Sequence, residues 1–190
     1  MNAQRLAAVA LVPFILIGMT PAARTAAAPA ARYKPCSLLT AADLEAALSA
    51  KVTRGAQEGE DTDTQGTPLQ GEPLDHCAWV LRAGQADVGA VLWVTRAVAP
   101  LPQLAAFWYP PKEELARQSG ATIESVRLPG AECRLFKNGK HPLLGVAQQT
   151  WCLVTSKGLA LSLEVTTQAP SPVAPQRVKN LLDRASSHLP

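Results

Sequence analysis

The sequence predicts an α+β domain in which helices pack on the faces of an antiparallel β-sheet that two disulfides reinforce. Segments with strand periodicity follow one another through short turns, which favours antiparallel pairing. Amphipathic helical segments lie at the beginning, in the middle and at the end of the chain. The four cysteines form an even set, as expected for disulfides.

The first 28 residues have the features of a secretory signal peptide. Arg5 precedes an apolar run from Leu6 to Met19, and small residues follow it, with candidate cleavage sites at Ala22 and Ala28. A membrane anchor is the alternative, but the run is shorter than the ~20 apolar residues that a bilayer-spanning helix needs. We therefore expect an exported protein, periplasmic or secreted, with no transmembrane segment in its mature chain. Its expected organisation is a signal peptide at 1–28, a flexible tail at 29–34 and a single α+β domain at 35–190.

The charge of the mature chain is expected to be close to neutral. The whole sequence has 18 basic and 15 acidic residues. Residues 1–28 hold two of the basic ones, Arg5 and Arg24, and none of the acidic ones. The net charge of the remainder is therefore only about +1, which argues against a nucleic-acid partner.

All four cysteines lie in the expected mature domain, and no two of them form a Cys-x-x-Cys pair. This spacing argues against a zinc site or a thioredoxin-type redox site. In an oxidising compartment we expect two disulfides, for which three connectivities exist. We expect Cys36–Cys77 and Cys133–Cys152, because each pair is near in sequence and Cys133 and Cys152 fall in neighbouring predicted strands.

The first half of the domain is predicted to contain a helix, a polar loop and a hairpin. Thr40 is placed to cap a helix that runs to about Ala50, and Asp43 completes a pattern like a capping box. The residues after Arg54 are rich in glycine and acidic side chains, which is typical of a loop. The segments expected after the helix are a short strand at Lys51–Thr53, a loop over 55–75, and hairpin strands at Cys77–Leu81 and Val88–Thr95.

The second half is predicted to contain helices on either side of four strands. A helix starts at Pro102 and must be interrupted by Pro110 and Pro111, which lack the backbone N–H. The segment from Lys137 to His141 is interpreted as a hairpin tip. The remaining elements are expected to be a helical turn at Lys112–Gln118, strands at Thr122–Arg127, Glu132–Phe136, Gly145–Thr155 and Leu159–Thr166, and a terminal helix that starts at Ser171-Pro172 or in the Pro175 region.

The last strand and the last helix have the clearest periodicities. Along the strand, the residues expected to point inward are Leu159, Leu161, Leu163 and Val165, and those expected outward are Ala160, Ser162, Glu164 and Thr166. The terminal helix has an apolar stripe of Val178, Leu181, Leu182, Ala185 and Leu189.

The segment Pro35–Leu44, with the sequence PCSLLTAADL, is followed by Cys77-Ala78-Trp79. These residues resemble the opening of a large family of exported bacterial lipoproteins of unknown function, whose domain is thought to be PsbP-like. The resemblance implies a PsbP-like fold and a disulfide from the Pro-Cys-x-Leu-Leu-Thr helix start to the Cys-x-Trp strand. It implies no catalytic residues. The chain departs from the family in lacking a lipidation motif before Cys36.

An acidic segment has the spacing of a calcium-binding loop. Asp61, Asp63 and Glu72 occupy the first, third and twelfth positions, and Gly66 occupies the sixth. Pro68 and the lack of an entering helix argue against such a site. A solvated acidic loop is the commoner meaning of such a run. Asp61, Asp63 and Glu72 are therefore metal-ligand candidates, and we expect no bound cofactor.

No catalytic motif is recognisable in the sequence. His76, His141 and His188 do not form a His-x-x-x-His pattern, and no Gly-x-Ser-x-Gly turn occurs. This absence favours a protein that is not an enzyme. An active site assembled from distant residues stays open as an alternative.

Phe107, Trp108 and Tyr109 are consecutive aromatic residues on a predicted helix. Successive helical residues turn by ~100°, so the three cannot all face a core. At least one is expected at the surface, where aromatic side chains favour partner contacts. The alternative is that Phe107 and Trp108 belong to the core and Tyr109 lies at its edge. Trp79 and Trp151 are each expected to pack on the disulfide of a nearby cysteine.

Together these observations predict an exported, non-catalytic binding or interaction module. Its partner would be a cell-envelope protein or a small ligand. Two alternatives remain, a cell-envelope enzyme with a dispersed active site and a small-ligand carrier with a cavity between sheet and helix.

Overall fold

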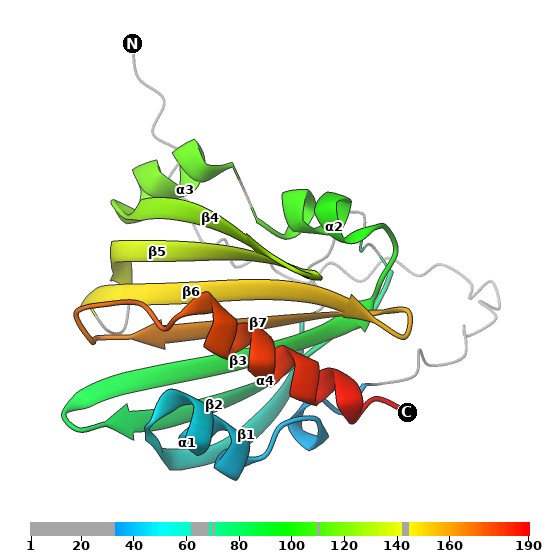
Figure 1. The fold of residues 1–190 in the computed structure, drawn as a ribbon, viewed down its shortest axis with the longest axis horizontal. Coiled ribbons are helices and arrows are strands. Elements are labelled where there is room, and N and C mark those ends of the chain that lie inside the picture. The colour runs from blue at the N-terminus through cyan, green and yellow to red at the C-terminus, as the bar shows by residue number, and fades with distance from the viewer. Residues whose placement is uncertain (1–32, 62–68, 70, 110, 142–144) are drawn as a thin grey trace, which may run out of the picture.

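The structure, a computed structural model, describes residues 33–61, 69, 71–109, 111–141 and 145–190, and they have the predicted α+β architecture. Seven strands form one antiparallel sheet in the order β1-β2-β3-β7-β6-β5-β4 (Figure 1). The strands are β1 (Lys51–Asp61), β2 (Leu74–Ala83), β3 (Ala86–Arg96), β4 (Thr122–Leu128), β5 (Ala131–His141), β6 (Gly145–Ser156) and β7 (Leu159–Thr167). The helices are the 3-10 turn η1 (Pro35–Ser37), α1 (Ala41–Leu48), α2 (Leu101–Trp108), α3 (Lys112–Ser119) and α4 (Pro175–Ser187). No helix in this part of the chain is both long and apolar enough to span a bilayer.

The sheet consists of two antiparallel ribbons that meet at its centre. β1, β2 and β3 follow one another, and the chain then passes through α2 and α3 to the opposite edge. From β4 it returns strand by strand until β7 pairs with β3. Lys157 and Gly158, between β6 and β7, both have positive φ, 49° and 77°. Two such residues form the tight turn that matches the twist of a hairpin.

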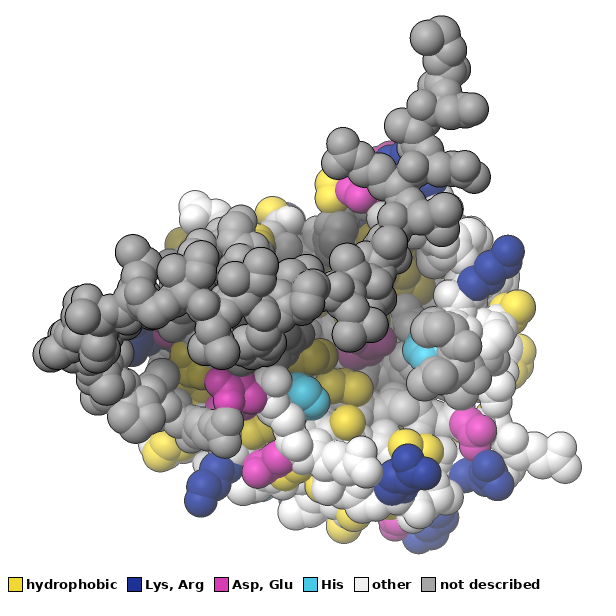
Figure 2. Space-filling view, turned by 180° about the vertical axis from the view of Figure 1, so that it is seen from behind, with side chains coloured by type: hydrophobic (Ala, Val, Ile, Leu, Met, Phe, Trp, Pro, Cys, Tyr) yellow, Lys and Arg dark blue, Asp and Glu magenta, His cyan; other side chains and the backbone are white. Residues whose placement is uncertain are grey.

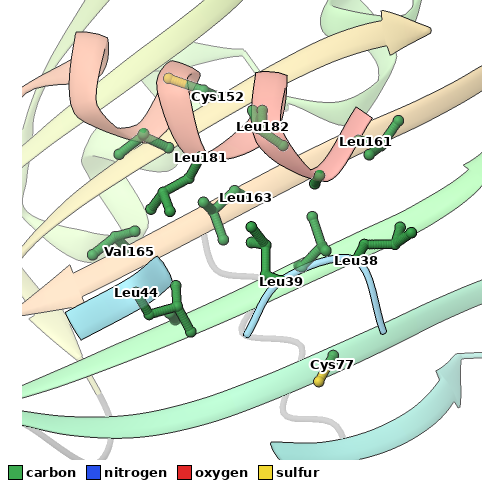
Figure 3. Packing of buried hydrophobic residues seen from close by; sticks show 14 of the residues in the cluster. Leu38, Leu39, Leu44, Cys77, Cys152, Leu161, Leu163, Val165, Leu181 and Leu182 are labelled. Carbon is green, nitrogen blue, oxygen red and sulfur yellow. The ribbon is translucent and has the colours of Figure 1, made fainter. Parts of the chain in front are cut away.

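One face of the sheet is closed by η1, α1 and α4, and we call it the α4 face. Figure 1 shows α1 and α4 in front of the sheet, and Figure 3 shows their leucines meeting those of β7. Leu44 of α1, Leu182 of α4 and Leu163 of β7 are fully buried in this core. The predicted apolar stripe of the terminal helix is confirmed, because all its members are buried: Val178, Leu181, Leu182, Ala185 and Leu189.

The predicted capping box at the start of α1 is present. Thr40 Oγ1 accepts a hydrogen bond from the Asp43 N–H at 3.2 Å, and Asp43 Oδ2 accepts one from the Thr40 N–H at 2.9 Å. The Asp43 carboxylate also pairs with Arg184 of α4 at 2.6 Å. A single side chain therefore fixes the start of α1 and ties it to α4.

Both predicted disulfides are confirmed. Cys36–Cys77 joins η1 to β2, and Cys133–Cys152 joins directly paired positions of β5 and β6. Their sequence separations are 41 and 19 residues. For loops of this size the chain-entropy model gives about 4 and 3 kcal/mol of stabilisation. Two structural disulfides indicate an oxidising, non-cytoplasmic environment.

The first strand is much longer than the sequence predicts. The expected strand at Lys51–Thr53 continues to Asp61, through residues that were expected to lie in a loop. β1 is an edge strand with most of its side chains exposed, and its register with β2 shifts twice. Such a strand pairs through its backbone alone, so its sequence carries no alternation of apolar residues by which to recognise it.

The predicted hairpin tip at Lys137–His141 is also wrong. β5 continues to His141, which pairs with Gly145 of β6. Asn138 has a φ of 57°, and the register shifts between Phe136 and Gly139. Asn138 N–H donates to Gln148 Oε1 at 3.0 Å. An Asn-Gly pair suits a β-bulge as well as a turn, and here the Gln148 side chain satisfies the backbone group that the bulge frees.

The second face of the sheet, which we call the α2 face, is more deeply buried at its centre than the sequence predicts. Ala160, Ser162 and Thr166 of β7, which were expected to point outward, are all buried. Leu104 of α2 packs with Ala160 and with Leu153 of β6 in a second, smaller core. The prediction is wrong because β7 lies at the centre of the sheet, where a strand is covered on both faces.

Candidate binding site

The α2 face is covered unevenly. Helices α2 and α3 pack on β4, β5 and β6, at one side of the sheet. Toward the other side, Val80 of β2 is 40% exposed, and Val91 and Trp93 of β3 are partly exposed. Figure 2 views the molecule from this side, and in the part it leaves visible hydrophobic, charged and histidine side chains lie interspersed. Exposed aromatic and apolar groups among polar ones are typical of a contact surface.

The consecutive aromatic residues of α2 divide between core and surface. Tyr109 is only 3% exposed, whereas Phe107 and Trp108 are partly exposed beside the second core. Tyr109 is therefore too deeply buried for the predicted partner surface. In the alternative, Phe107 and Trp108 belong to the core and Tyr109 lies at its edge; here Tyr109 is buried in the second core, and Phe107 and Trp108 pack partly buried against it. The helix ends at Trp108, and Tyr109 is extended with φ −110° and ψ 109°. A residue before proline favours this conformation. A partner role for Phe107 and Trp108 stays a prediction.

Tyr109 lies between the sheet and α2. Its ring centroid is 5.9 Å from that of Trp151, and the Arg134 guanidinium lies 4.9 Å from the ring. The Tyr109 hydroxyl donates to the Glu132 carbonyl oxygen at 3.3 Å. Burial raises the pKa of Tyr109 far above its ordinary value, although the neighbouring Ser162 hydroxyl and Arg134 oppose the rise. Tyr109 therefore stays a neutral hydrogen-bond donor at physiological pH.

Trp151 faces α2 and not the disulfide on which it was expected to pack. The centroid of its ring lies 4.4 Å from that of Phe136 and 5.9 Å from that of Tyr109. Cys152 is the next residue along β6, so its side chain points to the α4 face. Trp79 is two residues from Cys77 on β2, and both are buried in the α4-face core. Side chains alternate between the two faces of a strand. Trp79 therefore shares the face of Cys77, two residues away, whereas Trp151 lies on the opposite face from its neighbour Cys152.

Glu164 lies at the centre of the α2 face, where the sequence predicted an outward residue. It is paired with Val91 on β3 and with Trp151 on β6. Its carboxylate accepts hydrogen bonds from Thr166 Oγ1 at 3.3 Å and from Gln149 Nε2 at 3.4 Å. Both donors are neutral, and Glu164 makes no ion pair with any of the residues that the structure describes.

The environment of Glu164 disfavours its charged form. Burial raises the pKa of the Glu164 carboxyl, and the Thr166 hydroxyl and Trp151 indole oppose the rise. Among the described residues, the buried Trp151 Nε1 atom has no acceptor at hydrogen-bond geometry. Carboxyl groups with shifted pKa values occur at functional sites and also in structural polar networks.

Sequence reasoning missed Glu164 as a site residue. The one signal was its charge, which is unusual among the outward positions of β7. His76 and Trp93 were missed as a pair, because their residues are paired across β2 and β3 only in the fold. Their ring centroids are 4.6 Å apart, and the buried His76 Nδ1 has no hydrogen-bond partner among the described residues. Gly59 of β1 leaves room for the His76 ring, since a Cβ there would lie 2.4 Å from it.

A shallow hollow of about 160 Å³ lies between α2 and strands β4 and β5. Tyr109 and Arg134 line it, with the ion pair of Arg127 and Glu132 at 2.8 Å. Desolvation lowers the pKa of Arg134, although the guanidinium remains charged because its ordinary pKa is above about 12. The hollow adjoins the Tyr109 side of the α2 face.

The calcium-loop candidates are not brought together in the described part of the chain. Asp63 and the side chain of Asp61 lie outside the described residues. Glu72 pairs with Arg96 at 3.4 Å. Among the residues whose positions are given, no group of three or more His, Cys, Asp or Glu residues could hold a metal.

The histidines lie apart from one another. His76 is on β2 and His141 is at the end of β5, with β3, β7 and β6 between these strands. His188 follows α4, and its Nδ1 lies 2.9 Å from the Leu38 carbonyl oxygen. The described residues therefore offer no shared site for two histidines.

Comparison with protein-family models, with curated proteins and with solved structures finds no match. The resemblance of the Pro35–Leu44 segment to exported lipoproteins therefore stays a prediction.

Proposed function

We propose that this protein is an exported, non-catalytic binding module of the cell envelope, periplasmic or secreted, and that it binds its partner or ligand through the α2 face. The disulfides support export, because such bonds persist in oxidising compartments. A signal peptide at residues 1–28 would direct this export. The dispersed enzyme site has no comparable support, since the histidines lie on separate strands.

One observation supports the α2 face as the binding surface. Phe107 and Trp108 of α2 and Trp93 of β3 are partly exposed on the same side of the sheet. The opposite side is closed by α1 and α4. Aromatic side chains dominate the binding energy of interfaces, so their exposure on one face favours that face as the contact surface.

The test compares capture by variants in an extract of the organism's own cell envelope. We expect the double variant Phe107→Ala with Trp108→Ala to lose a protein or small molecule that the wild type retains. Val146→Ala is the control, because Val146 is 63% exposed and lies on β6 away from α2. Mass spectrometry of the retained material gives the readout. An identical set on wild type and on the folded double variant would contradict the proposal.

A further inference from the structure

The hollow of about 160 Å³ between α2 and strands β4 and β5 has a polar floor and an apolar wall. The floor consists of residues that pair across β4 and β5 and therefore share one face of the sheet: Ser125 with Arg134, and Arg127 with Glu132. The wall consists of two small residues of α2, Ala105 and Ala106. Polar groups that converge beside an apolar surface are typical of a site for a small ligand.

The described side chains that line the hollow have an excess of positive charge. Arg127 and Arg134 are cations, and Glu132 is the one carboxylate among these residues. Arg127 Nε donates to Glu132 Oε1 at 2.8 Å, so the charges of that pair offset each other. The excess is therefore the charge of Arg134, on which Glu113 of α3 acts electrostatically from outside the hollow. An anion in the hollow would be attracted to this charge.

The Arg134 guanidinium contacts a ring that is itself anchored. Its central carbon lies 4.9 Å from the centre of the Tyr109 ring. Tyr109 is buried, and its hydroxyl donates to the Glu132 carbonyl oxygen at 3.3 Å. A guanidinium directs its N–H donors outward in its own plane, so contact with the face of a ring uses none of them. Arg134 is therefore positioned before any ligand arrives, which lowers the entropic cost of binding.

From this arrangement we infer that the hollow binds the carboxylate of a small monoanion, with Arg134 as its main contact and Ala105 and Ala106 against its apolar body. A guanidinium matches a carboxylate in geometry, because two parallel N–H donors meet two oxygens. A dianion such as phosphate is disfavoured, since the Glu132 carboxylate lines the same hollow. The inference rests on the proposed function and names the ligand class for the part of the α2 face beside α2.

The competing explanation is that Arg134 only covers the Tyr109 ring. In that case the guanidinium contributes to packing, and a carboxylate added to the solution would not change its surroundings. The two explanations differ in whether a carboxylate binds and in whether its binding requires open space in the hollow.

The test follows the arginine Nε–H signals of the disulfide-bonded protein by two-dimensional NMR while propionate is added. Sodium chloride holds the ionic strength constant, and propionamide, a neutral molecule of the same size, is the ligand control. The Arg134 signal is identified by its absence from the spectrum of Arg134→Lys. We expect it to move in a saturable way with propionate and to stay fixed with propionamide.

Three variants locate the site, with the backbone N–H signals of β5 as the readout. Arg134→Lys keeps the charge but loses the planar pair of donors, and it should weaken propionate binding by about tenfold. Ala106→Leu fills the hollow from an exposed position of α2 without changing any charge, and it should abolish binding. Arg82→Gln is the control, because Arg82 pairs with Asp87 in the β2–β3 hairpin, and it should leave binding unchanged.

A short peptide separates the two sources of such a carboxylate, a free small acid and the C-terminus of a polypeptide. If N-acetyl-alanyl-alanine binds at least tenfold more tightly than propionate, the hollow takes a peptide C-terminus. Equal affinities assign it to a free small acid. The same peptide with an amidated C-terminus should not bind.

Each of four results would overturn the inference: a fixed Arg134 signal in excess propionate, equal binding of propionamide, tighter binding of inorganic phosphate than of propionate, or undiminished binding by the folded Ala106→Leu variant. The capture test separates this failure from that of the proposed function, because it depends on Phe107 and Trp108. If capture requires those two residues while propionate does not bind, the α2 face binds its partner without using the hollow.

Discussion

At the scale of single residues, Glu164 and its neighbours combine a charged group with a setting that disfavours charge. The carboxyl accepts from the Thr166 hydroxyl at 3.3 Å and faces the Trp151 indole. Neither group neutralises it. Proteins retain destabilising charged groups of this kind where binding or catalysis uses them, although the groups lower the stability of the fold.

We predict that Glu164→Gln stabilises the protein at neutral pH, by on the order of 1 kcal/mol. Burial raises the folded-state pKa of Glu164 above its ordinary value of 4.5. The folded protein then holds a proton that the unfolded chain releases, so the wild type loses stability as pH rises above that value. The gain from the substitution should be absent at lower pH and should grow as pH rises through the folded-state pKa.

Urea unfolding of wild type and variant across a pH series measures this difference. Glu124→Gln serves as the control, because that carboxylate is exposed and paired with Lys137. A Glu164→Gln variant that is less stable than wild type at neutral pH would show that the carboxylate is favourable in the fold. That result would contradict a raised pKa of Glu164 in the folded protein.

At the scale of elements, α2 is a short helix whose packing against the sheet depends on Tyr109. Leu104 and Ala105 provide the helix's own buried contacts, and Tyr109 adds a ring and a hydrogen bond just beyond its end. The sequence predicted the helix and its interruption correctly. It did not show which of the three aromatic residues is buried, because the extended conformation of Tyr109 breaks the helical period.

We predict that Tyr109→Ala destabilises the protein by about 3–5 kcal/mol, because it removes a large buried ring. Tyr109→Phe should cost about 1 kcal/mol, the loss of the hydrogen bond to Glu132. Denaturant unfolding measures both. Phe107→Ala is the matched control, since Phe107 is partly exposed, and it should have the smaller effect. Equal losses for Tyr109→Ala and Phe107→Ala would contradict the assignment of Tyr109 to the core.

At the scale of the whole molecule, the two disulfides act on different parts of the architecture. Cys36–Cys77 attaches the N-terminal η1 to β2, which no strand pairing would otherwise hold. Cys133–Cys152 joins two strands that already form a continuous ladder. The first bond also closes the longer loop, 41 residues against 19, so it should constrain the unfolded chain more than the second.

We predict that removing Cys36–Cys77 by paired Cys→Ala substitutions costs about 4 kcal/mol, and that removing Cys133–Cys152 costs about 3 kcal/mol. The measurement is the unfolding free energy of each double variant in guanidinium. The reverse order would mean that strain or residual structure outweighs the entropy of loop closure.

Much of this architecture could be predicted from the sequence, because it depends on local chemistry. The Thr40 cap, the stripe of α4 and the turn at Lys157-Gly158 all depend on neighbours in the chain. The length of β1 and the continuation of β5 to His141 depend on pairing with neighbouring strands. That pairing leaves no pattern in the sequence of the strand itself. The burial of Ser162 and the setting of Glu164 follow from the central place of β7, which arises only when β3 and β7 pair.

The most direct test of the account is a two-dimensional NMR titration of the tryptophan indole N–H signals with the cell-envelope extract of the capture test. The four tryptophans divide between the faces: Trp79 is buried in the α4-face core, and Trp93, Trp108 and Trp151 lie on the α2 side. We predict that the Trp93 and Trp108 signals move in a saturable way while that of Trp79 stays fixed. Movement of Trp79 alone, or no movement of any indole signal at saturating extract, would contradict the α2 face as the contact surface.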